Sequence, residues 1–359
     1  MKKILLTVMT LFLFSPLKVS AYSASATSAI LMDMDSNKII YADNIYKQRS
    51  IASISKIMTA ILAVESGKLE EIVTVGEEIS GAYGSGVYIK IGEEIKLKDL
   101  VYGLMLRSGN DAALSIAKYV SGSVEEFIKL MNEKAVSVGM KNSIFNNPSG
   151  LDDKGGGNIS TAYDMAMLTS YAMKNEIYKE IVSTKNHKVK TNMNYYDWTN
   201  KNRLLNSYKY CTGGKTGFTE IARRTLVTTA SKDGINLVVV TLNDGNDFVD
   251  HQNLFEEAFS EFTKYKILEK GYVEIIDEEF YSNRKFYIKE EYSEIFNANE
   301  IKNVILKFEL SKKFDYKTGD KIGVVKVLSS GKEIFKTDVF IELKKKKVKV
   351  FEFIFGWLK

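Results

Sequence analysis

The pattern of apolar residues in this chain changes at about Gly271. Before that point, segments with apolar residues at helical spacing alternate with short strand-like runs. After it, only strand-like runs separated by polar turns occur. A chain that changes periodicity in this way, and whose 359 residues exceed the usual size of one domain, is expected to fold into two units. We therefore expect a domain of helices and strands at 22–268 and a small all-β domain at 269–343.

The first domain opens with two strands around the polar turn 35–38. Helical spacing of apolar residues predicts helices at 53–65, 99–107, 111–120, 161–174 and 247–266. Apolar runs predict further strands at 210–216, 225–230 and 237–242. In the second domain, strands are expected at 304–308, 322–327 and 337–341, with no helix.

Both ends of the chain have a composition of their own. Residues 1–21 combine lysines at the start, a short apolar run and the small residues Val19-Ser-Ala21, which predicts a cleaved signal peptide. Residues 344–359 begin with four lysines and continue with bulky apolar residues, including Trp357. This pattern predicts an amphipathic helix that lies on an anionic membrane surface. A last β-strand is the alternative, although the apolar residues break strict alternation.

The net charge of +5 is located at these two ends, which hold nine lysines and a single acid. The body between them has no excess positive charge, so nucleic acid is not an expected partner. A single cysteine, Cys211, excludes an internal disulfide framework. His187 and His251 belong to no metal-binding motif. We therefore expect neither a metal ion nor a cofactor.

Hydrolysis without a metal or cofactor requires an activated side-chain nucleophile. The sequence has no G-x-S-x-G elbow for a Ser-His-Asp triad. In the S-x-x-K motif, the serine and lysine lie one helical turn apart, so the amine can take the hydroxyl proton. The motif occurs five times, beginning at Ser15, Ser53, Ser115, Ser282 and Ser329.

Only Ser53-Ile-Ser-Lys56 has a suitable context. It opens an apolar helix, where free backbone N–H groups favour an oxyanion. The other copies lie in the signal segment, in the middle of a helix, or in polar stretches of the β domain. On this motif alone, a helix N-cap is the more common role for a serine at this position.

A second element, Ser108-Gly-Asn110, lies in the break between two predicted helices. A hydroxyl and an amide at such a place can relay a proton and orient a peptide. By itself the segment is more often an ordinary interhelical turn.

The third element, Lys215-Thr-Gly217, lies on a predicted strand. Lysine and threonine there can hold a carboxylate, and glycine lets a substrate backbone approach closely. A second copy, Lys317-Thr-Gly319, is followed by an aspartate in the β domain and is expected to be a solvated turn.

In this order, the three elements resemble the signature of penicillin-binding proteins and serine β-lactamases, with Gly109 where aspartate is usual. The flanks 51–59, 106–113 and 214–219, together with Gly150-Leu-Asp152 and Ala162-Tyr-Asp164, are similar to the low-molecular-weight D-alanyl-D-alanine carboxypeptidases. The resemblance covers the whole chain after the signal segment. It implies an α+β fold: a β-lactamase/DD-peptidase-like domain with an antiparallel sheet flanked by helices, then a small all-β domain and a C-terminal amphipathic helix.

The resemblance also implies a reaction. Ser53 would attack the carbonyl between the two terminal D-alanines of a peptidoglycan stem pentapeptide, with Lys56 as general base. Ser108 would help to pass a proton to the leaving D-alanine, and Asn110 would orient the site. β-Lactam antibiotics would acylate Ser53, because their strained amide mimics the scissile bond.

Substrate binding is implied for the strand that carries the third element. Lys215 and Thr216 would bind the terminal carboxylate, and the backbone N–H groups of Ser53 and Phe218 would form the oxyanion hole. Some members of the family have histidine where Phe218 stands. Many have an arginine near the carboxylate, a role that stays open here among Lys201, Arg223 and Arg224.

Three other functions remain possible. A DD-endopeptidase would use the same residues. A serine β-lactamase would leave the β domain unexplained, and no E-x-x-L-N segment lies between Ser108 and Lys215. An inactive wall-binding scaffold is disfavoured because the motifs are intact. For all of these, the implied location is the outer face of the bacterial cytoplasmic membrane, facing the wall.

Overall fold

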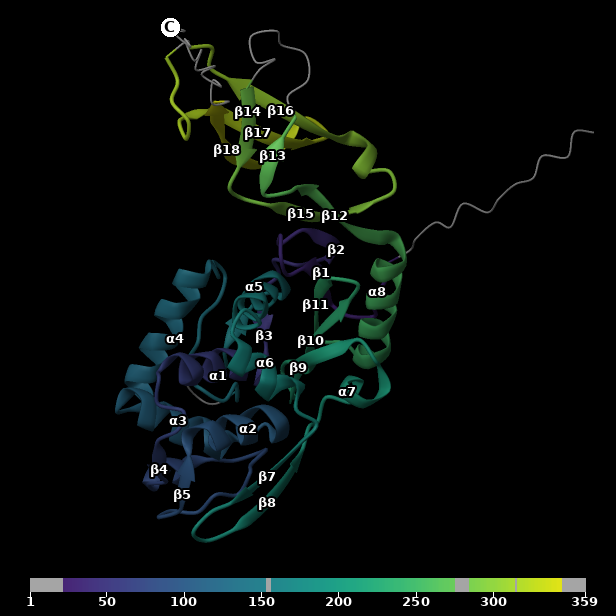
Figure 1. Ribbon diagram of the computed structural model, residues 1–359. Coiled ribbons are helices and arrows are strands. Elements are labelled where there is room, and N and C mark those ends of the chain that lie inside the picture. Colours follow the sequence, from purple (N-terminus) through teal and green to yellow (C-terminus); the bar gives the residue numbers. More distant parts are fainter. Residues whose placement is uncertain (1–21, 153–155, 275–283, 314, 344–359) are drawn as a thin grey trace, which may run out of the picture.

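The computed structural model describes residues 22–152, 156–274, 284–313 and 315–343. A central sheet and its helices make up the lower part of Figure 1, and the strands that follow them form the upper part. The expected signal peptide, 1–21, and the expected amphipathic helix, 344–359, lie outside the described residues. In the part of the chain that is described, no helix is long and apolar enough to cross a membrane.

A five-stranded antiparallel sheet forms the centre of the lower part, in the order β2-β1-β11-β10-β9. Its strands are β1 (Ser28–Asp33), β2 (Ile39–Asp43), β9 (Cys211–Thr219), β10 (Arg223–Lys232) and β11 (Ile235–Leu242). All five were predicted from apolar runs. Side chains alternate between the two faces, so that Ile30 and Met32 belong to one apolar core and Leu31 to another.

Helices cover both faces of this sheet (Figure 1). One face is covered by α1 (Lys56–Glu65), α2 (Leu97–Arg107), α3 (Asn110–Ser121), α4 (Val124–Val138), α5 (Ala162–Ala172) and α6 (Glu176–Ser183). The other face is covered by α8 (Asp247–Glu261), with the short α7 (Leu204–Ser207) beside it. Because β9 is an edge strand, its outer edge is not paired with another strand of this sheet, and groups from the helical layer can approach it there.

Several elements were not predicted. The helix α4 has ordinary end signals, because the Ser123 hydroxyl accepts a hydrogen bond from Glu126 N at 3.1 Å and Gly139 ends the helix at a φ of +88°. The helix α6 and the hairpin of β7 (Asn186–Lys190) and β8 (Tyr195–Thr199) were also missed. Shorter pairs are β3 (Arg49–Ser50) with β6 (Ile159–Ser160) and β4 (Ile72–Thr74) with β5 (Glu94–Lys96).

The predicted helix at 247–266 is wrong in its last part. The helix α8 ends at Glu261, and Phe262–Leu268 forms the strand β12. Pairing with β15 (Tyr292–Asn297) overrides the helical pattern here, because the segment is rich in aromatic and β-branched residues that suit a pleated surface. The strand β12 thus lies before the expected domain boundary at residue 268 and pairs with a strand beyond it.

The upper part contains a second five-stranded antiparallel sheet, in the order β13-β14-β18-β17-β16. Its strands are β13 (Gly271–Val273), β14 (Arg284–Ile288), β16 (Val304–Leu310), β17 (Lys321–Ser329) and β18 (Lys332–Leu343). The last three contain the runs predicted at 304–308, 322–327 and 337–341. Apolar side chains from these strands and from Leu268 form a separate small core.

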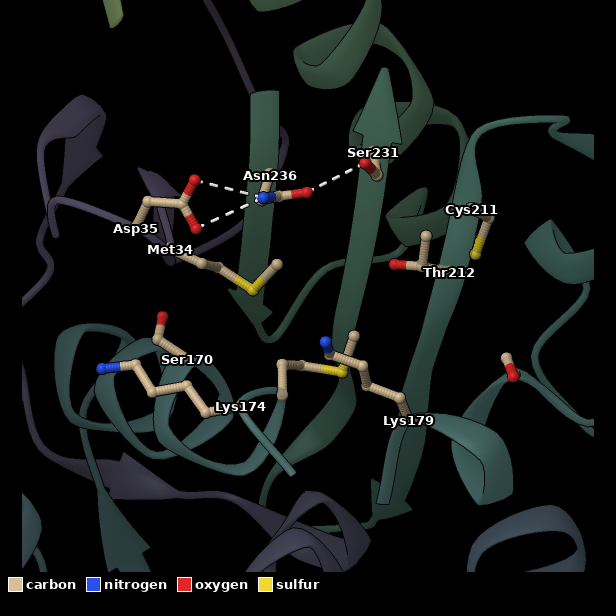
Figure 2. Close-up of a pocket in the computed structure, with 11 residues that line it drawn as sticks. Met34, Asp35, Ser170, Lys174, Lys179, Cys211, Thr212, Ser231 and Asn236 are labelled. Carbon is tan, nitrogen blue, oxygen red and sulfur yellow. Dashed lines mark hydrogen bonds between the residues drawn. The ribbon is translucent and has the colours of Figure 1, made fainter. Parts of the chain in front are cut away.

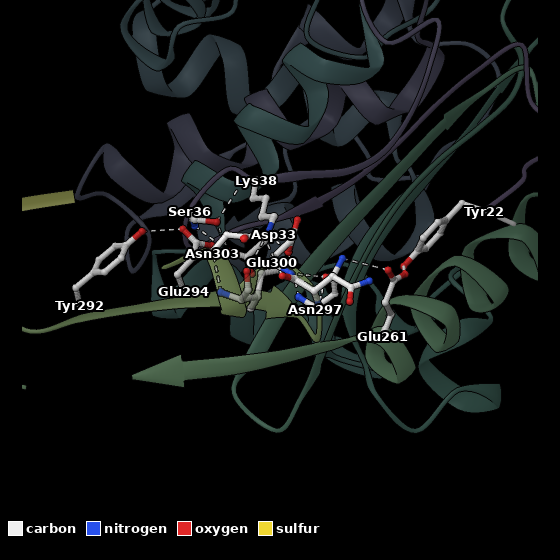
Figure 3. Close-up of polar contacts among 12 residues, drawn as sticks. Tyr22, Asp33, Ser36, Lys38, Glu261, Tyr292, Glu294, Asn297, Glu300 and Asn303 are labelled. Atoms are coloured by element: carbon white, nitrogen blue, oxygen red, sulfur yellow. Dashed lines mark hydrogen bonds and ion pairs between the residues drawn. The ribbon is translucent and has the colours of Figure 1, made fainter. Parts of the chain in front are cut away.

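Polar contacts join the two parts (Figure 3). The Lys38 ammonium donates to Glu300 Oε2 at 2.7 Å and to the carbonyl oxygen of Ile295 at 3.0 Å, and it lies 4.9 Å from the centroid of the Phe296 ring. On the other side of the junction, Asn297 Nδ2 of β15 donates to Glu261 Oε1 at 3.4 Å, and the Tyr22 hydroxyl donates to Oε2 of the same carboxylate at 2.7 Å.

Candidate active site

A cleft of about 550 Å³ opens where the start of α1, the α2–α3 connection and the edge strand β9 meet. Each of the three motifs singled out in the sequence contributes residues to its lining. Its lining residues are Ser53, Ser85, Ser108, Asn200, Lys201, Arg203, Thr216, Gly217, Phe218, Arg224, Asp247 and Phe248. Lys56, Asn110 and Lys215 are buried directly behind these residues.

Ser53 lies in a 3₁₀ turn, Ala52–Ser55, and the α-helix starts only at Lys56. The sequence had predicted one helix from residue 53. Ala52 enters the turn with a φ of +49°, a conformation that costs an L-residue about 1 kcal/mol or more. Gly150 packs directly against this turn, and a side chain could not replace it there because a Cβ would lie 2.0 Å from the carbonyl oxygen of Ala52.

Gly217 allows β9 to approach the same turn. A Cβ added there would lie 3.0 Å from Ser53 N and 2.4 Å from Thr225 Oγ1, so a side chain could enter only if its surroundings moved. The glycine of the third element therefore lets the strand pass directly over the start of the turn.

The Lys56 ammonium is completely buried and has three neighbours. Its Nζ lies 3.0 Å from Ser53 Oγ and 2.7 Å from Asn110 Oδ1, and it also contacts the carbonyl oxygen of Ser149. Burial, together with the positive charge of Lys215, holds the pKa of Lys56 well below its ordinary value. A neutral amine is thus favoured beside the Ser53 hydroxyl.

Ser108 has a left-handed backbone conformation, with a φ of +65°, which ends α2 and turns the chain into α3. Asn110 is the first residue of α3, and its orientation is fixed because its Nδ2 donates to the carbonyl oxygen of Tyr83 at 2.6 Å. Its Oδ1 is therefore left to face Lys56. The loop at 83–85 was not predicted to take part in the site.

Lys215 is also buried, and its Nζ lies 3.1 Å from Ser108 Oγ and 2.7 Å from the carbonyl oxygen of Thr216. Burial and the nearby charge of Lys201 lower the pKa of Lys215 to about 7. Ser108 is thus in contact with one buried lysine, while Asn110, two residues later, is in contact with the other.

The cleft has a cationic rim. Lys201 lines it and lies 3.3 Å from Ser85 Oγ, and burial together with Arg107 lowers its pKa. Arg224 also lines the cleft but is paired with Asp247 at 2.6 Å. Of the three cations left open by the sequence, Arg223 is the one that does not line the cleft.

Some cleft residues were not predicted. Arg203 and Phe248 stand together at the rim, with the guanidinium carbon 5.6 Å from the centre of the ring. Neither belongs to a motif, so only the fold brings them here. Asp152, in contrast, lies in the flanking segment 150–152 that the sequence singled out, and it accepts hydrogen bonds from Ser50 Oγ at 2.7 Å and from Thr219 Oγ1.

The rejected candidates lie elsewhere. Ser115 is buried inside α3 and donates to Glu78 Oε1 at 2.8 Å. Lys317 is exposed in a turn that the Asp320 carboxylate closes at 2.8 Å. His251 is buried between the hydroxyls of Thr228 and Thr241, and burial lowers its pKa to about 3. Among the residues that the structure describes, no group of three or more His, Cys, Asp or Glu side chains is arranged to hold a metal ion.

Comparisons with known proteins agree with this geometry. A family model described as D-alanyl-D-alanine carboxypeptidase matches residues 16–246. The chain is 35% identical over 229 residues to the D-alanyl-D-alanine carboxypeptidase DacF of Bacillus subtilis, covering 62% of this chain and 58% of DacF. It is 36% identical over 256 residues to DacC of Escherichia coli, covering 66% and 62%. It therefore spans less than two thirds of the length of these two relatives.

Among solved structures, penicillin binding protein 5 from Haemophilus influenzae aligns with a TM-score of 0.73 at 26% identity, covering 90% of this chain and 98% of that one. The alignment confirms the expected fold, in which an α+β domain with an antiparallel sheet between helices is followed by an all-β part. The match of the family model to more than half of the residues is independent of this fold comparison. The chain therefore belongs to the D-alanyl-D-alanine carboxypeptidase family.

Proposed function

We propose that this protein is a serine-type D-Ala-D-Ala carboxypeptidase, which removes the terminal D-alanine from peptidoglycan stem pentapeptides through an acyl-enzyme on Ser53. The observation that carries the proposal is the position of the buried Lys56 amine, 3.0 Å from Ser53 Oγ at the floor of an open cleft. A burial-lowered lysine pKa beside a hydroxyl is the arrangement that general-base activation of a serine requires.

The neighbours of Lys56 support its role as base. A neutral amine has two N–H bonds and one lone pair. Asn110 Oδ1 and the carbonyl oxygen of Ser149 are acceptors, so they take the two N–H bonds. The lone pair is then left for the proton of Ser53.

Ser53, once deprotonated, attacks the carbonyl carbon between the two terminal D-alanines, and the oxyanion forms at the N–H groups of Ser53 and Phe218. The close approach of Gly217 to Ser53 N supports this position. Removing one donor from such a site typically costs about 3–4 kcal/mol of transition-state stabilisation. The C–N bond then breaks, and Ser108 passes a proton to the departing amine of D-alanine. Water finally hydrolyses the ester.

The terminal carboxylate of the substrate binds at Lys215 and Thr216. Of the three cations that the sequence left open, Lys201 is best placed to assist, because Arg223 does not line the cleft and Arg224 is already paired with Asp247. β-Lactams acylate Ser53 in the same orientation. Phe218 is 61% exposed, so its side chain forms the outer edge of the cleft and leaves binding to its backbone.

We also propose that the enzyme is exported and works at the outer face of the cytoplasmic membrane. The segment 1–21 would direct export, and 344–359 would hold the protein on anionic lipid through its lysines and apolar residues. Both assignments rest on the sequence.

Mass analysis of a synthetic stem pentapeptide after incubation with the protein tests the activity. Loss of one alanine and appearance of the tetrapeptide are expected. Cleavage of cross-linked muropeptides without this product would indicate an endopeptidase, and rapid turnover of penicillin would indicate a β-lactamase. Absence of both hydrolysis and covalent labelling by a fluorescent penicillin would leave only a wall-binding scaffold.

A further inference from the structure

A second cavity, of about 540 Å³, is shown in Figure 2. It lies at the other end of β9 and β10 from the catalytic cleft. One wall is formed by the first residues of β9, Cys211 and Thr212, with Ser231 and Asn236 from β10 and β11. The other wall comes from α5, α6 and the residues between them. Its volume matches that of the catalytic cleft and falls in the range usual for small-molecule sites. No part of the proposed reaction uses it.

Two methionine side chains give the cavity an apolar surface, and Cys211, whose side chain packs on the core at the other face of the sheet, borders it. Figure 2 shows Met34, from the β1–β2 turn, and Cys211, from β9. Met173, at the end of α5, also lines the cavity. Thioethers are flexible and polarizable, and they pack well on flat unsaturated groups. The cavity can therefore accommodate the apolar body of a ligand.

Positively charged side chains outnumber negatively charged ones around the cavity, and the two kinds lie on different walls. Figure 2 shows Lys174 and Lys179 on the helix side, facing the Asp35–Asn236 pair on the sheet side. The Asp35 carboxylate is already satisfied, because it accepts from Asn236 Nδ2 at 3.1 Å and from Lys264 Nζ at 2.7 Å.

The two lysines differ in their partners. Lys179 pairs at 2.7 Å with Glu176, which is 82% exposed, so this contact is a weak surface ion pair. Lys174 forms no ion pair with any residue that the structure describes. The cavity thus keeps about one uncompensated positive charge beside an apolar wall.

We propose that this cavity is a binding site for a small carboxylate with an apolar, flat body. The carboxylate would pair with Lys174, and the body would pack on Met34 and Met173, next to Cys211 at the border of the cavity. One unpaired ammonium favours a monoanion over a doubly charged phosphate. The Asp35 carboxylate on the facing wall would further repel a second negative charge.

Cys211 provides a test, because it is the only cysteine in the chain and lines the cavity. The probes are dithio-bis-nitrobenzoate, an aromatic carboxylate disulfide, and the neutral dithiodipyridine, which both convert the thiol to a mixed disulfide and release a coloured thiol. Naphthoate is the competing ligand. The variants are Lys174→Gln and, as a matched control, Lys141→Gln, an exposed lysine that does not line the cavity.

We expect naphthoate to protect Cys211 from both reagents in a saturable way. We expect Lys174→Gln to slow the carboxylate reagent about fivefold, the size of one exposed ion pair, and to leave the neutral reagent unchanged. Lys141→Gln should change neither rate. Absence of protection, or equal effects of the two variants on the carboxylate reagent, would overturn the proposal. The assay needs no catalysis, so its result is independent of the proposed function.

Discussion

The Lys215 ammonium lies 3.1 Å from the hydroxyl of Ser108, although 107 positions separate the two residues in the chain. This contact joins the edge of the sheet to the left-handed turn between α2 and α3. Because Lys215 is buried, the contact also fixes the Ser108 hydroxyl. The two segments thus behave as one unit, and disturbing either of them should affect proton transfer and carboxylate binding together.

The assignment of the nucleophile is tested by Ser53→Ala. Without the hydroxyl no acyl-enzyme can form, so carboxypeptidase activity should fall by a factor on the order of 10⁴ or more, and fluorescent penicillin should no longer label the protein. The control is Ser115→Ala, which removes the serine of a second S-x-x-K motif and only breaks a bond to Glu78. Labelling of Ser53→Ala, measured on a denaturing gel, would rule out Ser53.

The two K-T-G sequences should respond differently to alanine. Lys215→Ala removes a buried cation that contacts Ser108, and kcat/KM for the pentapeptide should fall by about 10²–10³-fold, the usual cost of losing a buried charged partner. Lys317→Ala affects an exposed turn and should be neutral. Equal losses would mean that the context of the motif does not decide its role.

Gly217→Ala tests the close approach of β9 to the Ser53 turn. The new Cβ would lie 2.4 Å from Thr225 Oγ1 and 3.0 Å from Ser53 N. We expect the rate of acylation by penicillin to fall about tenfold or more, and unfolding to become easier by about 1–3 kcal/mol. Gly245→Ala is the control, because a Cβ there meets no atom within 4 Å. An unchanged acylation rate in Gly217→Ala would argue against the oxyanion hole at this place.

The motifs predicted residues that the structure brings together around one cleft. The strands of the sheet were visible in the apolar runs, whereas their antiparallel arrangement was implied by the family resemblance. What these patterns could not predict depends on tertiary contacts. The 3₁₀ turn at Ser53 is packed closely against Gly150 and Gly217, which come from distant segments. The carbonyl oxygen of Ser149 carries no side-chain signal, yet it completes the surroundings of Lys56.

The errors in the fold have a similar origin. Residues 262–268 directly follow the helix α8, and they form a strand because they pair with β15. The hairpin β7–β8 is mostly polar, with Val189 and Trp198 as its buried residues, so alternation gave little signal. In contrast, α4 could have been found from its Ser123 cap and Gly139 end.

Truncation after Leu343 tests the proposed membrane anchor. The removed residues hold six lysines and Trp357, so their loss should abolish pelleting with anionic vesicles. The described fold ends with β18 at Leu343, so hydrolysis of a soluble pentapeptide should persist. Neutral vesicles are the control, to which both forms should bind weakly. Vesicle binding that survives truncation would place the membrane contact elsewhere.

The pH dependence of kcat/KM follows from the two buried lysines. In the proposed reaction Lys56 is neutral when it accepts the proton of Ser53, so activity should rise with pH as Lys56 deprotonates. Lys215 must be charged to hold the carboxylate, so activity should fall as pH passes its pKa of about 7. The profile should be bell-shaped, with apparent pKa values that belong to the coupled pair.

Lys201→Ala distinguishes an effect of Lys201 on the two lysine pKa values from a simple loss of substrate binding. The positive charge of Lys201 lowers the pKa of both Lys56 and Lys215, because it disfavours a second and third ammonium nearby. Removing the charge of Lys201 should raise the pKa of both lysines, so the whole pH profile of kcat/KM should move to higher pH. This shift is expected even if the maximal kcat/KM also falls. Lys190→Ala removes an exposed lysine that does not line the cleft and should leave the profile in place. A profile that loses height in Lys201→Ala without moving would show that Lys201 acts on the substrate alone.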